Sequence, residues 1–427
     1  MYIFKCYLLV YWSDIYSIPP TPPPMTTAID NLNEETQSNS SRSTLLSAAT
    51  EADRIRNFGY SAETHKVQTK DGYILGIFRI TNATVRGHQK PQPIALMMHG
   101  LVSSSDAWIL GGPADALPFN LADSGYDVWL GNYRGNPYSN RHISLSSNDR
   151  RFWQYTLDDV SSKDLPATID YILQLTHQNS LHYFGHSQGS AIMFALLSTQ
   201  PKYNQKLKTS HMFAPIAFMS HARSKPIHLA APLFGTYSNL DAVYGDMPFL
   251  QNPLLRKVLG INKCRSPFTH RCLCDFWLNL SLGYSTHIPQ SIYSEIFNTH
   301  PASCSTHQFI HLVQAYVSGH FRPYDHGIVG NLRRYNQTTP PDYQVANIKP
   351  RFPLNLYYSD NDVLSAREDV EHLIRILGKR CLPHFINEKN FAHADFLWSS
   401  NVKAVLNNGI LRQMNKVEHL LQQENKS

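Results

Sequence analysis

Charged side chains are scarce in this sequence, and no cluster of basic residues with interleaved aromatics stands out. Only 16% of the 427 residues are Asp, Glu, Lys or Arg, and the formal net charge of +6 is spread along the chain. Nucleic-acid-binding proteins concentrate basic charge in a patch or stripe, so we do not expect a nucleic acid as a partner. Hydrophobic residues make up 42% of the chain, which predicts that most of it is globular.

Cysteine is also rare, and its spacing does not suit a structural metal site. Of the six cysteines, Cys264, Cys272 and Cys274 crowd into one short segment. No second C-x-C or H-x₃-H pair accompanies them, so we expect no metal and no cofactor. A local disulfide in an exported protein is the simpler interpretation. N-x-S/T sequons, which permit export without showing it, occur at Asn39, Asn82, Asn279, Asn336 and Asn425.

The first part of the chain lacks the composition of a packed core. Lys5 precedes a short apolar run at residues 6–12 that cannot span a bilayer. No small-x-small cleavage site follows, and a proline-rich stretch at 18–24 leads into polar residues instead. We therefore expect residues 1–47 to be an N-terminal segment, with a poor signal peptide and a disordered linker, and order to begin near Ala52.

Beyond this segment, extended apolar runs alternate with stretches of helical periodicity. The pair Asp71 and Gly72 between two extended runs predicts a hairpin. The near-continuous apolar run at 93–98 suits a strand that is buried on both faces. Alternating strands and helices predict an α/β fold with a mostly parallel sheet covered on both faces. Strands are expected at 93–98, 126–130, 181–184, 212–218, 352–358 and 382–386, and helices at 116–124, 164–175, 191–197, 368–377 and 402–414.

The alternation stops after residue 218 and resumes only near residue 352. The residues between show helical and irregular patterns and no clear strand. An ordinary connection inside an α/β sheet is far shorter than this. We therefore predict a mainly helical cap at 219–345, inserted between two parts of the core at 48–218 and 346–416. A C-terminal tail is expected at 417–427.

One turn carries a pattern that is typical of a catalytic nucleophile. An apolar-aromatic run begins at Leu181, Ser187 then sits between Gly185 and Gly189, and helix-forming residues follow. In a nucleophile elbow, G-x-S-x-G forms a sharp strand-to-helix turn that exposes the serine hydroxyl above the sheet. The bare pattern is weak, and the flanking strand and helix make it much stronger.

Two further residues supply what such a serine needs. A serine hydroxyl requires a base to take its proton, and the base requires an orienting carboxylate. Asp362 and His393 follow expected strand ends, and with Ser187 they keep the chain order Ser, Asp, His of α/β-hydrolases. Asp360 stays open as the alternative acid, because residues two apart on an extended chain face the same way.

An oxyanion hole would need two backbone donors at the same edge of the sheet. We expect one from the N–H of Gln188 and the other from the N–H of Leu101, in the loop after 93–98. Four other histidines are interpreted as structural rather than catalytic. His99 and His186 are expected to pack in their loops, His384 to face solvent from a strand, and His372 to lie on a helix surface.

Several strings in the chain resemble the acid lipase family, which contains the gastric and lysosomal acid lipases and their insect relatives. The resemblance covers about residues 52–415. It is carried by DGYIL at 71–75, HGL at 99–101, ADSGYDVWLGN at 122–132, RGN at 134–136, DLPATIDY at 164–171, GHSQG at 185–189, ND at 361–362 and HADFLW at 393–398.

The resemblance implies an α/β-hydrolase core with a helical cap and lid. It implies Ser187 as nucleophile, Asp362 as acid, His393 as base, and Leu101 and Gln188 as oxyanion donors. The implied substrate is a neutral lipid ester, triacylglycerol first and cholesteryl ester as the alternative, met at a lipid droplet, membrane or emulsion interface. A secreted or lysosomal location is implied as well, and no obligate protein partner is inferred.

Other hydrolase substrates, including a peptide bond, stay open as alternatives. So does a non-catalytic lipid-binding protein on the same scaffold, although such a protein would be expected to have lost its nucleophile or base. Apolar cap residues at 229–234 and 276–278 could line a lid that faces lipid, or could form the core of the cap itself.

The chain also departs from the family pattern at several positions. Tyr133 stands where the family usually has serine, and Ala394 stands where it has leucine. The cap disulfide of the family joins cysteines nine apart. Here Cys264 has Cys272 at a spacing of eight and Cys274 at a spacing of ten, so the pairing stays open.

Overall fold

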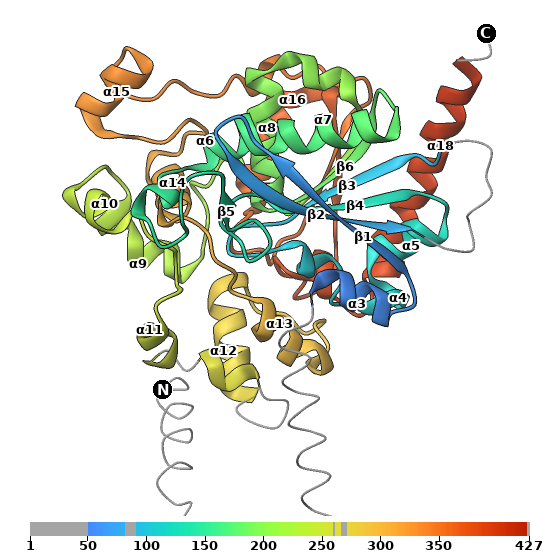
Figure 1. Cartoon of the computed structure of the whole chain (residues 1–427), viewed down its shortest axis with the longest axis horizontal. Coiled ribbons are helices and arrows are strands. Elements are labelled where there is room, and N and C mark those ends of the chain that lie inside the picture. The colour runs from blue at the N-terminus through green and yellow to red at the C-terminus, as the bar shows by residue number, and fades with distance from the viewer. Residues whose placement is uncertain (1–49, 82–90, 259–260, 266–270, 425–427) are drawn as a thin grey trace, which may run out of the picture.

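The fold is a mixed β-sheet between two layers of helices, with a helical cap at one side (Figure 1). A computed structural model describes residues 50–81, 91–258, 261–265 and 271–424. The signal peptide and linker expected at 1–47 lie outside the described residues. Order was expected near Ala52, and the first described helix begins at Glu51 with Thr50 as its N-cap.

The nine-stranded sheet has the order β1-β2-β4-β3-β6-β7-β8-β9, with β5 paired to β2. Neighbours from β4 to β9 are parallel, whereas β2 runs antiparallel to β1, β4 and β5. The expected Asp71–Gly72 hairpin joins β1 to β2. The strands are β1 (Ser61–Gln68), β2 (Tyr73–Thr81), β3 (Ile94–Met98), β4 (Asp127–Gly131), β5 (Arg141–His142), β6 (Leu181–His186), β7 (Leu207–Phe213), β8 (Leu354–Tyr358) and β9 (Cys381–Phe385).

The central strands are buried on both faces, as their apolar runs predict. Along β3, Leu96 and Met98 join the core layer beneath α7, α8 and α16, whereas Ala95 and Met97 join the layer beneath α3, α5 and α18. The helices of the core are α3 (Glu51–Asn57), α4 (Gly112–Asp115), α5 (Leu117–Asp123), α6 (Leu157–Asp159), α7 (Leu165–Thr176), α8 (Gln188–Thr199), α16 (Arg367–Leu377), α17 (Asp395–Trp398) and α18 (Asn408–Glu424).

The cap lies between β7 and β8, as the break in alternation predicts. Its described residues form helices and one isolated β-bridge, between Pro248 and Ser305. No helix that the structure describes is long and apolar enough to cross a membrane. The cap helices are α9 (Lys225–Phe234), α10 (Asn239–Tyr244), α11 (Pro253–Val258), α12 (Arg271–Leu282), α13 (Tyr293–Thr299), α14 (Thr306–Ser318) and α15 (Gly327–Tyr335).

Two elements depart furthest from the expectation drawn from the sequence. The strand expected at 212–218 is β7, Leu207–Phe213, because Ala214 takes a left-handed conformation (φ 46°) that ends the strand. The helix expected to end at residue 414 continues to Glu424, so residues 417–424 are helical rather than a tail. The helix is held there by buried Val417 and Leu421 and by the hydrogen bond from Lys208 Nζ to Glu418 Oε1, at 2.6 Å.

A buried ion pair fixes the loop that follows β4. The Arg134 side chain is 1% exposed, and its Nε lies 2.8 Å from Oδ1 of the fully buried Asp164. The backbone N–H of Arg134 donates to the same carboxylate, at 2.9 Å. Nη1 donates to Asp71 Oδ2 at 2.8 Å, so one guanidinium links the β4 loop, the β1–β2 hairpin and the start of α7. A buried charge needs such partners, since removing one of them leaves an uncompensated charge.

Asp164→Ala is therefore expected to lower the free energy of unfolding by about 3 kcal/mol, because the buried Arg134 loses its principal partner. Glu371→Ala serves as the control. Glu371 pairs with Arg367 at the surface of α16, where an ion pair contributes about 0–1 kcal/mol. Urea unfolding followed by tryptophan fluorescence measures both values, and an equal loss in the two variants would contradict the role of Asp164.

Candidate active site

The residues singled out in the sequence gather at the carboxyl edge of the parallel strands. Leu101 follows β3, Ser187 follows β6, Asp362 follows β8 and His393 follows β9. These strands lie in the order β3-β6-β7-β8-β9, so the acid and the base approach the serine from one side. Ligands of open α/β sheets bind beyond this edge.

Ser187 forms the sharp turn that its pattern predicts. Its backbone has φ 55° and ψ −117°, which an L-residue rarely adopts, and its N–H donates to Phe213 O at 2.9 Å. The flanking glycines are required by space. A Cβ on Gly189 would lie 2.4 Å from Met98 O, and one on Gly185 would lie 2.7 Å from the Gly189 backbone. The first turn of α8 can therefore pack against the end of β3 only because residues 185 and 189 have no side chain.

His393 and Asp362 form a buried hydrogen-bonded pair. His393 Nδ1 lies 2.9 Å from Oδ1 and 2.8 Å from Oδ2 of Asp362, whose side chain is fully buried. The Asp362 Oδ1 atom also accepts the N–H groups of Leu364 and Ser365, at 2.8 and 2.9 Å. The alternative acid, Asp360, is instead exposed to solvent and pairs with Arg367 on α16. The structure thus separates the two carboxylates that the sequence left open.

Ser187, Gln188, Leu101 and His393 line one cavity of about 350 Å³. No hydrogen bond joins Ser187 to His393 among the described residues, and such bonds often tighten only when substrate is bound. Neither the Leu101 N–H nor the Gln188 N–H has an acceptor within the described part of the chain. The remaining walls are mostly apolar and come from both core and cap, including Ile216, Ile227, Phe249, Trp277, Leu278, Phe297, Phe309, Leu312, Leu364, Leu397 and Trp398.

The histidines interpreted as structural are indeed held away from proton transfer. Burial lowers the pKa of His99 and of His186 to about 3, so both stay neutral at physiological pH. His186 Nε2 donates to the backbone O of His393, at 2.8 Å. His372 lies on the exposed side of α16, as expected. The expectation for His384 is wrong: its ring stacks on Tyr357 at 4.5 Å and is half-buried.

Contacts from the cap to the catalytic loops were not visible in the sequence. The His393 N–H donates to Leu282 O at the end of α12, at 3.1 Å. Gln188 Nε2 donates to Gln308 Oε1 on α14, at 2.6 Å. Asp395, two residues after His393, accepts a hydrogen bond from Ser285 at 2.7 Å, and burial raises its pKa to about 6. No local pattern marks these partners, because they lie far apart in sequence.

The cap disulfide joins Cys264 to Cys274. This settles the open pairing in favour of the spacing of ten, and it ties the segment before α12 to that helix. Cys304 and Cys381 are buried free thiols. Among the described residues, no group of three or more His, Cys, Asp or Glu side chains is placed to hold a metal ion.

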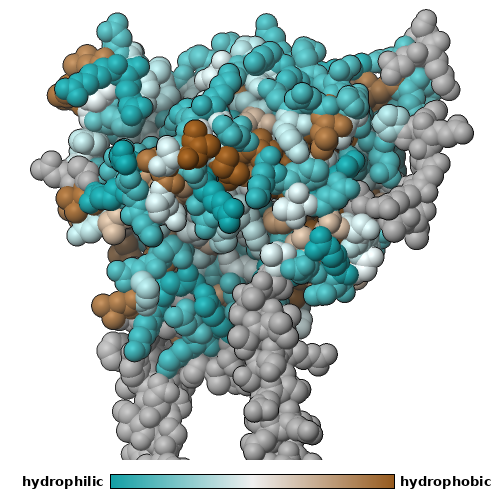
Figure 2. Space-filling model, in the orientation of Figure 1, coloured by the Kyte–Doolittle hydropathy of each residue, from teal (hydrophilic) through white to brown (hydrophobic). Residues whose placement is uncertain are grey.

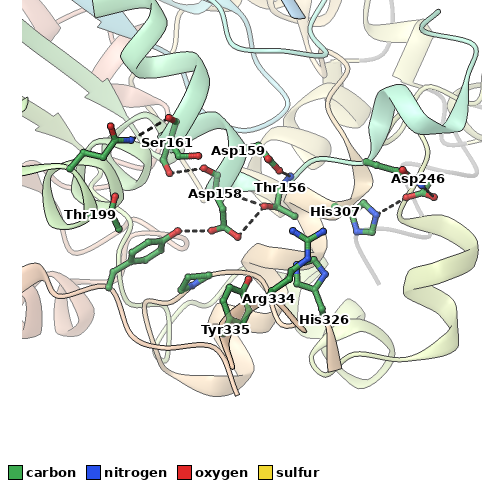
Figure 3. A pocket seen from close by; sticks show the side chains of 15 residues that line it. Thr156, Asp158, Asp159, Ser161, Thr199, Asp246, His307, His326, Arg334 and Tyr335 are labelled. Atoms are coloured by element: carbon green, nitrogen blue, oxygen red, sulfur yellow. Dashed lines mark hydrogen bonds and ion pairs between the residues drawn. The ribbon is translucent and has the colours of Figure 1, made fainter. Parts of the chain in front are cut away.

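A second cavity, of about 720 Å³, lies apart from Ser187 between the segment around α6 and the cap (Figure 3). Polar side chains line it, and its carboxylates already have partners: Asp158 accepts from Tyr343, and Asp246 pairs with His307 at 2.8 Å. None of the residues predicted for the active site lines this cavity. The apolar cavity above Ser187 is therefore the candidate active site.

Gly189→Ala is expected to lower the free energy of unfolding by about 3 kcal/mol, because the new Cβ collides with the Met98 backbone rather than with a movable side chain. Gly409→Ala is the control, since its Cβ meets only Arg412 Nη2 at 3.9 Å. In helix α18 that change should be neutral or stabilising by up to about 1 kcal/mol. Calorimetric unfolding compares the two, and a stable Gly189→Ala variant would contradict the close packing of the turn.

Comparison with known proteins identifies the family. Residues 52–112 match the partial α/β-hydrolase lipase region, and residues 93–252 match the α/β hydrolase fold. The chain is 35% identical to Lipase 3 of Drosophila melanogaster over 86% of this chain and 93% of that protein. It is also 35% identical to gastric triacylglycerol lipase of Bos taurus, over 84% of this chain and 89% of the relative.

A solved structure supports the same fold. The soluble variant of monoglyceride lipase from Saccharomyces cerevisiae matches with a TM-score of 0.50 at 15% identity, over 83% of this chain and 96% of that one. These findings confirm the α/β-hydrolase fold and the resemblance stated from the sequence. The chain belongs to the α/β-hydrolase lipases, in the acid lipase family that includes the gastric lipases and Lipase 3 of Drosophila.

Proposed function

We propose that this protein is a lipase that hydrolyses neutral lipid esters, with triacylglycerol as its substrate, through an acyl-enzyme on Ser187. The observation that carries the proposal is the buried pair of His393 and Asp362 beside a serine in a strained turn, all within one apolar cavity. The lipase family of the chain supports the reaction class. The similarity to gastric triacylglycerol lipase of Bos taurus supports triacylglycerol as the substrate.

Acylation begins with proton transfer from Ser187. The carboxylate of Asp362 accepts the Nδ1–H of His393, which leaves Nε2 unprotonated and free to act as the base. The Ser187 Oγ attacks the ester carbonyl carbon, and its proton passes to Nε2. The carbonyl oxygen then becomes an oxyanion, which the N–H groups of Leu101 and Gln188 stabilise.

Collapse of this intermediate breaks the bond to the alcohol. His393 returns its proton to the leaving alkoxide, so a diacylglycerol departs and the fatty acyl group stays on Ser187. A water molecule then gives one proton to His393 and attacks the acyl carbon, and the same steps release the fatty acid and regenerate Ser187. No metal or cofactor enters this sequence.

The size and lining of the cavity suit an acyl chain. Its volume of about 350 Å³ is near the lower end for ligand pockets, and its walls are mostly apolar. We infer that one acyl chain enters at a time, while the rest of the triacylglycerol stays outside. Exposed apolar side chains on the cap favour contact with a lipid droplet, membrane or emulsion surface. They include Leu229, Leu233, Val243, Leu254, Ile328 and Val329, and Figure 2 shows such surface over α10, α11 and α15.

The same proposal includes secretion or delivery to the lysosome. The disulfide between Cys264 and Cys274 suits an oxidising compartment. The sequon at Asn336 lies exposed at the end of α15, where a glycan can be attached. Peptide mapping of the protein from the culture medium, before and after glycosidase treatment, tests both points.

The direct test measures fatty acid release from emulsified triolein and from tributyrin, with the wild-type chain and with Ser187→Ala. We expect steady release by the wild type and a loss of about 10³-fold or more in the variant, since no nucleophile remains. Equal activity of the two would overturn the assignment. Faster turnover of cholesteryl oleate than of triolein would move the substrate to sterol esters. If Ser187 does not react with a fluorophosphonate, the protein is a non-catalytic lipid-binding protein instead.

The assignment of the acid gives a sharper prediction. Asp362→Asn is expected to lower kcat by about 10⁴-fold, because an amide in this place favours the wrong tautomer of His393. Asp360→Asn, two residues away, should leave kcat within about twofold, because Asp360 pairs with Arg367 at the surface. Tributyrin turnover of both variants checks this, and a larger loss in Asp360→Asn would reverse the assignment.

A further inference from the structure

The carbonyl of Gly100 receives hydrogen bonds from two buried side chains. The Tyr133 hydroxyl donates to Gly100 O from the loop after β4, and His99 Nδ1 lies 2.8 Å from the same oxygen. Tyr133 is 1% exposed and His99 is fully buried. Their rings lie in contact, with centroids 4.0 Å apart and planes tilted by 31°, so the two donors support each other.

The protonation state of His99 follows from its other ring nitrogen. The Asn136 Nδ2 group, which can only donate, lies 3.0 Å from His99 Nε2. Nε2 therefore accepts, and the ring proton of the neutral imidazole resides on Nδ1. Asn136 Nδ2 also donates to Asn132 Oδ1, at 2.6 Å. The loop after β4 thus selects the tautomer that donates to Gly100 O.

Gly100 O belongs to the same peptide unit as the N–H of Leu101. This peptide is trans, so its C=O and N–H point in opposite directions within one plane. Two donors that hold the oxygen therefore also set the direction of the N–H. The peptide lies against the nucleophile, since a Cβ on Gly100 would be 3.1 Å from Ser187 Cβ. Leu101 itself lines the cavity.

We propose that Tyr133, together with His99, is a positioning residue that aims the Leu101 N–H at the oxyanion. The proposal rests on the hydrolase function proposed above. Tyr133 acts through the Gly100–Leu101 peptide, and its hydroxyl also interacts with the side chain of Gln188. The hydroxyl of a serine at position 133 would be attached directly to Cβ, close to the backbone. The longer tyrosine side chain carries its hydroxyl as far as Gly100 O in the loop after β3. Preorganised oxyanion donors matter because their orientation is set before the charge develops.

Tyr133→Phe tests this, because it removes only the hydroxyl. Loss of a whole oxyanion donor costs about 10²–10³ in kcat, and we expect a misaimed donor to cost about 10-fold, with KM within about twofold. Affinity for an alkyl boronic acid, which bonds Ser187 and places an oxygen in the oxyanion site, should fall by the same factor as kcat. Binding of an uncleavable ether analogue of the ester should stay unchanged.

Tyr203→Phe is the matched control, because it also removes one hydroxyl hydrogen bond from a buried tyrosine, the 2.9 Å bond to Asp170 outside the site. Its kcat should match the wild type, while its change in Tm should resemble that of Tyr133→Phe. A kcat of Tyr133→Phe equal to that of the wild type would overturn the proposal. So would an equal loss of kcat, of affinity for the boronic acid and of affinity for the ether analogue, because a general defect of the site would then explain all three.

A second variant covers the case in which Tyr133→Phe folds poorly. His99→Phe removes the other donor and keeps an aromatic ring, so it should show the same split between kcat and KM. A loss of ester turnover by Ser187→Ala, with full turnover by both Tyr133→Phe and His99→Phe, would overturn the positioning role alone. An inactive wild-type enzyme would instead reject the proposed function.

Discussion

The candidate active site depends on one strained turn and on the strands that hold it. A residue at φ 55° and ψ −117° costs about 1–3 kcal/mol relative to ordinary backbone, so the surrounding structure must impose it. Strand β7 does so through the hydrogen bond from Ser187 N–H to Phe213 O, and β3 does so through the close approach of Met98 O to Gly189. The sheet order places β3 and β7 on either side of β6. Ser187, although only 6% exposed, therefore reaches the cavity at the end of β6.

The cap contributes more than a cover for this turn. It reaches three loops of the candidate site, each through a separate hydrogen bond. The Ala302 N–H donates to Val102 O beside the oxyanion loop, Gln308 accepts from Gln188 at the turn, and Leu282 O accepts from the His393 N–H. A change in the cap can therefore alter reactivity as well as substrate choice. The cap supplies part of the cavity wall as well as these hydrogen bonds to the loops.

The sequence predicted those parts of the site that are encoded locally. The turn at Ser187 and the strand before it are short, contiguous patterns, and burial on both faces is legible in the run at 93–98. The choice between Asp360 and Asp362 is different, because it depends on Arg367 drawing one carboxylate outward and on His393 meeting the other. Strand β7 was misplaced because Thr209, Ser210 and His211 are polar but buried, while the apolar residues at 214–218 are a buried loop. Thr209 and His211 can be buried because their side chains bond His182 on β6 and Tyr357 on β8. A pattern of hydropathy does not show such bonds, so it does not predict that these polar residues belong to a buried strand.

The order of the proposed catalytic residues along the chain has a consequence for biosynthesis. Ser187 precedes the cap, whereas Asp362 and His393 follow it. Helix α18 comes later still, and its Glu418 bonds Lys208 on β7 and His182 on β6, the strand that ends at the nucleophile. A growing chain that folds from its N-terminus thus presents a serine without a base until almost the whole sequence has been made. In the proposed mechanism, the enzyme therefore acquires its acid and its base only late in synthesis.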